Sequence, residues 1–92
     1  MELIGELDET KGALRVLLIL HEGPLPRTKL IGNAAVGKQA VYTALRVLQQ
    51  LGLVEEERTK GFPNTVFTGL TERGRKVAKM VGEIEKLVNM GV

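Results

Sequence analysis

The 92-residue chain contains no cysteine and no serine, and it has a single histidine and a single aspartate. Without cysteine, it can form neither a disulfide framework nor a thiolate metal site. Serine and cysteine nucleophiles are excluded in the same way, and no acid–base pair or metal-ligand spacing stands out among the glutamates. His21 lies close to a helix-ending glycine, where a surface or capping position is expected. The sequence therefore predicts a protein that is not an enzyme and that carries no metal and no cofactor.

Long hydrophobic runs are absent, and aromatic residues make up only 3% of the chain. The longest aliphatic run, Val16–Leu20, has five residues, whereas a membrane span requires about 18. The N-terminus, Met1–Ile4, has neither the basic segment nor the cleavage site of a signal peptide. No linker or repeat divides the sequence. We therefore expect residues 1–92 to form one cytoplasmic domain with an aliphatic core and no membrane partner.

Acidic residues are missing from segment 23–50, which carries Arg27, Lys29, Lys38 and Arg46. Residues 1–22 differ from it, since they hold five acidic residues and two basic ones. The net charge of the whole chain is only +2. The concentration of positive charge in one segment, more than the total, indicates attraction to phosphate groups and hence to nucleic acid.

Apolar periodicity and turn residues predict four helices and a hairpin, so the fold class is mainly α with a small β-hairpin. The first helix is expected from Asp8 or Thr10 to about His21, although the run Val16–Leu20 would also suit a buried strand. The other helices are expected at residues 27–33, 38–51 and 72–90, and the two strands at residues 54–60 and 65–70.

Helix ends are predicted from local signals. Pro26 suits the start of the second helix, and Gly37 is an acceptable cap for the third. Gly52 fits the position just after the third helix, and Thr71 can cap the last.

The second strand of the hairpin alternates at Val66, Thr68 and Leu70, as one buried face requires, but Phe67 is apolar as well. A β-bulge at Gly69 would reconcile these two observations.

The helix at residues 38–51 has two different faces. At 100° per residue, Val41, Ala44, Leu45, Leu48 and Gly52 fall on one side. The opposite side carries the polar residues Gln39, Thr43, Arg46 and Gln50, with Lys38 and Tyr42 on its flank. Amide, hydroxyl and guanidinium groups in such a row supply the donors and acceptors that can read base edges in a major groove.

Two motifs carry a family resemblance. The first extends from the second predicted helix to the first strand and is matched without gaps by Leu30, Val36, Val41, Tyr42, Leu45, Leu48, Gly52, Leu53 and Val54. The second is Leu70-Thr71-Glu72-Arg73-Gly74. With the order of the elements, these motifs resemble the winged helix-turn-helix transcription regulators, particularly small MarR-like and PadR-like proteins of prokaryotic or archaeal type. The chain departs from the pattern at Ala35, where glycine is usual, at Gly37, where Ser or Thr is usual, and at Thr43, where many relatives carry Arg or Lys.

The resemblance implies a winged helix-turn-helix with a three-helix core, a wing and a C-terminal helix. It implies sequence-specific binding of double-stranded DNA, with helix 38–51 in the major groove and the wing along the backbone or minor groove. The DNA-contacting residues are then predicted to be Arg27, Thr28, Lys29, Lys38, Gln39, Tyr42, Thr43, Arg46, Arg58 and Lys60. The acidic run Glu55–Glu57 would repel phosphates near the base of the wing, and Phe62 at its tip is either an exposed anchor or folded back on the hairpin.

Apolar residues near both termini exceed what a small core can cover, which predicts a homodimer. The interface is expected to include Leu3, Ile4, Leu7, Val81, Ile84, Leu87 and Val88, with residues 72–90 as its main helix. A two-fold dimer would place two reading helices about 34 Å apart, one turn of DNA. The alternative is a winged helix used for protein–protein contact without DNA reading, because fold does not fix function. No small-molecule effector is indicated.

Overall fold

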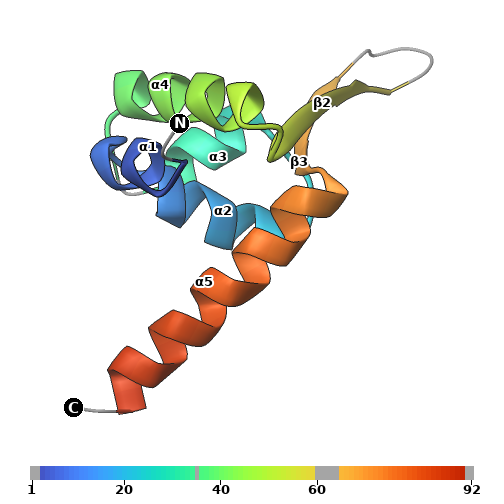
Figure 1. Cartoon of the computed structure of the whole chain (residues 1–92). Helices are drawn as coiled ribbons and strands as arrows, with labels where there is room; N and C mark the ends of the chain where they lie inside the picture. The colour runs from blue at the N-terminus through green and yellow to red at the C-terminus, as the bar shows by residue number, and fades with distance from the viewer. Residues whose placement is uncertain (1–2, 35, 60–64, 91–92) are drawn as a thin grey trace.

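The computed structural model describes residues 3–34, 36–59 and 65–90, with residues 3 and 4 described by their backbone alone. The elements in chain order are α1 (Leu3–Glu9), α2 (Ala13–His21), β1 (Leu25–Pro26), α3 (Arg27–Asn33), α4 (Lys38–Gln50), β2 (Val54–Arg58), β3 (Val66–Leu70) and α5 (Glu72–Met90). Helices α1 to α4 form the body of the molecule, the β2–β3 hairpin projects from it, and α5 runs away on the other side (Figure 1). The expectation of a mainly α fold is confirmed. The predictions at Ala35, Lys60 and Phe62, and those for the side chains of Leu3 and Ile4, lie outside the described residues.

The N-terminal region forms two helices, where the sequence predicted one beginning at Asp8 or Thr10. The chain turns between α1 and α2 at Gly12, whose φ of 82° lies in the left-handed region. A Cβ at this position would also lie 3.1 Å from a methyl carbon of Val36. The prediction was wrong because an isolated glycine is tolerated within a helical pattern, whereas this one adopts a conformation that ends it.

Helix α2 is the centre of the core. Its run Val16–Leu20 is helical, so the alternative of a buried strand is wrong. The helix packs against both α4 and α5, and its residues Ala13, Val16, Leu17 and Leu20 are buried. Aliphatic side chains from α3, α4 and the sheet complete the cluster, as the scarcity of aromatic residues predicted.

The sheet has three antiparallel strands in the order β1-β3-β2. The two-residue strand β1 was not predicted; it pairs Leu25 with Thr68 and Pro26 with Phe67. The β2–β3 register is continuous from Val54 opposite Leu70 to Arg58 opposite Val66, so the predicted bulge at Gly69 is absent from this hairpin. Phe67 needs no bulge, because it is only half-buried on the opposite face of the sheet from Thr68 and Leu70.

Helix α5 begins at Glu72 and is capped by Thr71, as predicted. The Thr71 hydroxyl accepts a hydrogen bond from the backbone N–H of Gly74 (3.0 Å) and donates one to the carbonyl of Gly52 (2.7 Å). The N-terminal half of α5 packs on the body through Gly74 and Ala78, whereas every residue from Glu83 to Met90 is exposed. Among the described residues, no helix is long and apolar enough to cross a membrane.

Candidate nucleic-acid interface

Helix α4 presents the polar face predicted from the sequence. It begins after Gly37, which has the extended backbone of an N-cap, and ends just before Gly52, whose φ is 74°. Its apolar side is anchored in the core by four buried residues, Val41, Ala44, Leu45 and Leu48. This anchoring fixes the rotation of the helix and leaves the opposite side toward solvent.

The residues of that opposite side differ in exposure. Gln39, Arg46 and Gln50 are exposed, and Thr43 is half-buried. Arg46 makes no ion pair within the described part of the chain. A row of amide and guanidinium groups is therefore open to a partner, with Thr43 set deeper between them.

A second cluster lies on the flank of α4 that faces the start of α3. The half-buried ring of Tyr42 has the guanidinium carbon of Arg27 5.6 Å from its centroid and the Nζ of Lys38 5.8 Å from it. Cations at such distances interact favourably with the face of an aromatic ring. Three residues predicted to contact DNA are thus gathered at one place by α3 and α4, while Thr28 and Lys29 are exposed in the first turn of α3.

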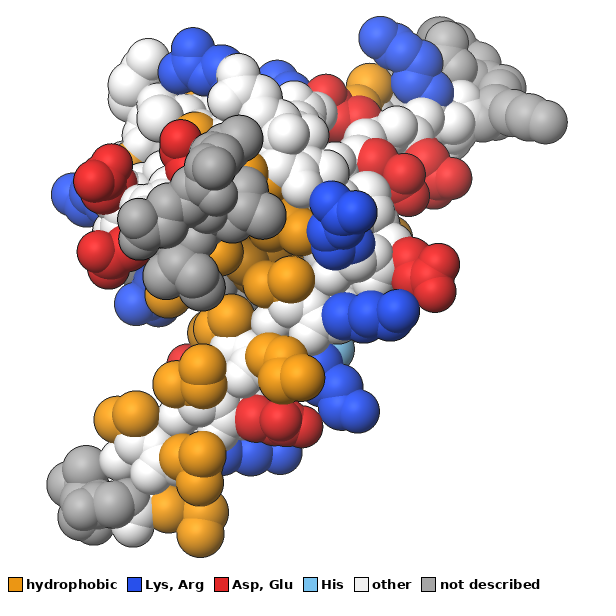
Figure 2. All heavy atoms as spheres, in the orientation of Figure 1, with side chains coloured by type: hydrophobic (Ala, Val, Ile, Leu, Met, Phe, Trp, Pro, Cys, Tyr) orange, Lys and Arg blue, Asp and Glu red, His pale blue; other side chains and the backbone are white. Residues whose placement is uncertain are grey.

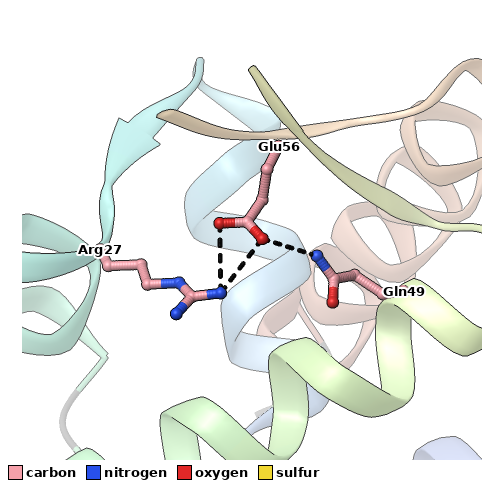
Figure 3. Close-up of polar contacts among 3 residues, drawn as sticks. All are labelled: Arg27, Gln49 and Glu56. Atoms are coloured by element: carbon pink, nitrogen blue, oxygen red, sulfur yellow. Dashed lines mark hydrogen bonds and ion pairs between the residues drawn. The ribbon is translucent and has the colours of Figure 1, made fainter. Parts of the chain in front are cut away.

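Arg27 also contacts the wing, through a residue that the sequence analysis did not select. Its Nη2 lies 3.1 Å from each carboxylate oxygen of Glu56 on β2. The side-chain amide of Gln49 on α4 donates a hydrogen bond to the same carboxylate at 3.1 Å. Figure 3 shows Arg27 and Gln49 approaching Glu56 from two sides. One carboxylate therefore joins α3, α4 and β2.

The acidic run on β2 is divided between the two faces of the strand. Glu56 and Arg58 line a shallow hollow together with Arg27 and Val66. Glu55 and Glu57 line a different hollow, on the side of Phe67 and Arg75. Repulsion of phosphates was predicted from Glu55–Glu57 as a whole, but alternation along a strand puts only Glu56 on the side of the predicted DNA contacts. The alternation of residues along β2 could have identified Glu56 from the sequence as a neighbour of the predicted DNA contacts. For Gln49 the sequence offered no comparable signal beyond its place on the flank of α4.

The apolar residues predicted to form the dimer interface are largely uncovered on α5. Ile84, Leu87 and Val88 are 60%, 68% and 63% exposed, and Val81 is half-buried. Figure 2 shows hydrophobic side chains following α5 away from the body. Leu14 on α2, 43% exposed, lines a hollow with Val81 and Ile84 and so extends this surface onto the body. By contrast, Leu7 packs partly buried against the core, so it has contacts within its own protomer that the sequence analysis did not foresee.

Comparison with known proteins agrees with this arrangement. Residues 9–91 match the family described as HxlR-like helix-turn-helix. No curated protein matches the chain. The family match covers most of the sequence. It therefore identifies a narrower family than the predicted resemblance to MarR-like and PadR-like regulators.

Three solved structures illustrate the likeness. The reduced form of the transcriptional regulator YodB from B. subtilis has a TM-score of 0.76 at 20% identity, over 90% of this chain and 81% of that one. A doubly substituted mutant of ZitR from Lactococcus lactis has a TM-score of 0.76 at 27% identity, over 88% of this chain and 56% of that one. A transcriptional regulator of the MarR family from Enterococcus faecalis has a TM-score of 0.78 at 19% identity, over 96% of this chain and 80% of that one.

The present chain thus matches little more than half the length of the chain in that ZitR structure. The winged-helix architecture is shared with all three structures, and the predicted wing and the helix that precedes it are therefore confirmed as elements of the fold. The family match over residues 9–91, with which the fold and the exposed polar face of α4 agree, shows that the chain belongs to the HxlR-like helix-turn-helix family of DNA-binding transcription regulators.

Proposed function

We propose that this protein is a homodimeric, cytoplasmic regulator that recognises a specific double-stranded DNA sequence by inserting α4 into the major groove. One observation carries the proposal: the polar side of α4 is open while its apolar side is fixed in the core. A rigidly held helix with exposed amide and guanidinium groups can present them to base edges in a constant register.

In the proposed complex, α4 residues have two roles. Gln39, Thr43 and Arg46 face the bases, with Arg46 suited to a bidentate contact with guanine or to a phosphate. Lys38 and Tyr42 face the adjoining backbone, as do Thr28 and Lys29 at the start of α3. Arg27 and Arg58 extend this basic border toward the wing, and Lys60 is assigned there from the sequence alone.

The exposed stripe on α5 supports the homodimer. Ile84, Leu87 and Val88 are exposed on one side of the helix, and contiguous exposed apolar residues mark interaction surfaces. A second copy of α5 would cover the stripe under two-fold symmetry and place the two α4 helices on successive half-sites, about 34 Å apart. Leu3 and Ile4 are assigned to the same interface from their sequence alone.

The direct test is selection of bound duplexes from a random pool, followed by sequencing. The proposal predicts enrichment of one half-site motif repeated as an inverted pair one helical turn apart. Recovery of single, unpaired half-sites would remove the dimeric arrangement but leave DNA reading intact. No enrichment, together with no binding of any duplex at low salt, would reject the proposal.

The alternative, a winged helix used only for protein–protein contact, is favoured by the modest net charge of +2 and by the three adjacent glutamates on β2. Salt dependence separates the two functions. If about three phosphates are neutralised per protomer, the logarithm of the binding constant should fall with the logarithm of salt concentration with a slope of roughly −2.7 per bound protomer. A duplex affinity that is insensitive to salt would support the protein-binding alternative.

A further inference from the structure

The hollow between the start of α3 and the wing combines two arginines with one carboxylate. It is lined by Arg27, Glu56, Arg58 and Val66. Arg27 and Glu56 form the only ion pair within the described ranges of the chain. The two residues are 29 positions apart in sequence, so the tertiary fold, and no local helix or turn pattern, brings them together.

The geometry of this ion pair leaves part of Arg27 available. Both carboxylate oxygens of Glu56 contact the same guanidinium nitrogen, Nη2. No other hydrogen bond from this guanidinium is found in the described part of the structure. A guanidinium that binds a carboxylate or phosphate most strongly does so through two parallel N–H donors. The contact with Glu56 is thus weaker than the contact that Arg27 can make with a well-placed anion.

The surroundings of the pair also permit exchange. The side chains of Arg27 and Glu56 are 43% and 31% exposed, so solvent screens their attraction. Arg58 lines the same hollow and adds a second positive charge. Gln49 already directs its amide N–H groups toward the position of the Glu56 carboxylate. An anion that entered the hollow would meet two guanidinium groups, and one that took the place of the Glu56 carboxylate would also meet the amide donor of Gln49.

We propose that this hollow binds a phosphate of the DNA backbone and that Glu56 is an intramolecular competitor for that phosphate. In the free protein Glu56 holds Arg27, and in the complex the phosphodiester takes over Arg27 with the help of Arg58. The competition lowers affinity for any duplex, and therefore sets how strongly the protein binds DNA outside its specific site. This inference rests on the proposed function and identifies one phosphate contact and the residue that opposes it.

The test compares glutamine variants that keep the shape of each side chain and remove its charge. Glu56→Gln is the test variant. Glu55→Gln and Glu57→Gln are the matched controls, since they make the same charge change on the same strand but on the face away from Arg27. Binding to a labelled duplex of arbitrary sequence, about 30 base pairs long so that it spans two half-sites, is measured by fluorescence anisotropy at low salt. Thermal unfolding confirms that each variant is folded.

Glu56→Gln is expected to bind this duplex about two- to fivefold more tightly per bound protomer than the unchanged protein, the range of an exposed ion pair. Both controls should gain less, and the gain should fade as salt is raised. In an Arg27→Gln background the effect of Glu56→Gln should shrink to that of the controls, because Arg27 is the group for which Glu56 competes.

Three results would overturn the inference. A loss of affinity in Glu56→Gln would mean that Glu56 positions Arg27 for DNA. An equal gain in all three glutamine variants, or a gain that persists without Arg27, would mean only general repulsion between glutamates and DNA. If the unchanged protein and every variant fail to bind any duplex, both the inference and the proposed function fail. The other two results overturn the inference alone, because the protein still binds DNA in them.

Discussion

Gly74 on α5 lies directly against the backbone of Leu53, the residue that precedes β2. A Cβ placed on Gly74 would overlap the carbonyl oxygen of Leu53 and lie 2.9 Å from its carbonyl carbon. The same carbonyl oxygen accepts the backbone N–H of Thr71 at 3.0 Å. The glycine that closes the motif Leu70–Gly74 therefore permits the close approach that joins α5 to the wing.

Gly74→Ala should destabilise the protein, because the added methyl group meets backbone atoms that cannot rotate away. We expect the loss in free energy of unfolding to be about 1–3 kcal/mol or more, as for overpacking in a core. Gly82→Ala in the same helix is the matched control, since its Cβ would find only a methyl carbon of Leu18 at 3.8 Å. It should gain about 0.5–1 kcal/mol from helix propensity.

Urea unfolding of both variants at one protomer concentration measures the two effects. Equal stability of Gly74→Ala and the unchanged protein would show that α5 and Leu53 are not held in this close contact.

Thr71 fixes the same junction through its hydroxyl. It receives the Gly74 N–H and donates to the Gly52 carbonyl, so it links the end of α4 to the start of α5. Thr71→Ala should cost about 0.5–2 kcal/mol in the free energy of unfolding, as for other N-cap residues. Thr71→Ser keeps the hydroxyl and should retain most of the stability. If serine proves as costly as alanine, the methyl group and not the hydroxyl accounts for the role of Thr71.

Features that depend on neighbouring residues were predicted correctly from the sequence, whereas features that depend on residues far along the chain were missed. Helices α3 and α5 begin as predicted, because Pro26 and Thr71 act on their own neighbouring residues. Strand β1 was missed because two residues give no periodic signal and are paired only through β3, which comes much later in the chain. Gly12, at the break between α1 and α2, also lies close to a distant residue, Val36, which the local sequence does not show.

The candidate interface shows the same division. The open side of α4 followed from helical periodicity alone. The contact of Arg27 with Glu56 did not, because period-two alternation shows which strand residues share a face but not which helix that face meets.

Arg46→Ala tests the reading face of α4. If Arg46 makes a bidentate contact with a base, the variant should lose about 1–3 kcal/mol of binding free energy for the selected sequence. The loss for an arbitrary duplex should be smaller, so that specificity falls. Lys79→Ala removes one exposed positive charge from α5 and serves as the control. Anisotropy titrations with both duplexes provide the comparison. An Arg46→Ala variant that is folded and keeps its full affinity would remove this residue from the interface.

Ile84→Glu tests the apolar stripe on α5. Ile84 is 60% exposed in the single chain, and it would be covered if a second copy packed on it. A charge buried there without a partner costs far more than an exposed one, so the variant should be monomeric at concentrations at which the unchanged protein is a dimer. Its own fold should persist, because the side chain contributes little to the core of one protomer.

The matched control for this interface is Lys86→Glu, which also introduces a glutamate but on the opposite side of α5, and which should remain dimeric. Sedimentation equilibrium distinguishes the two states directly. Dimers of Ile84→Glu as stable as those of Lys86→Glu would place the interface elsewhere. With a confirmed monomer, the affinity for a two-half-site duplex should fall to that for a single half-site, because the two α4 helices would no longer be linked.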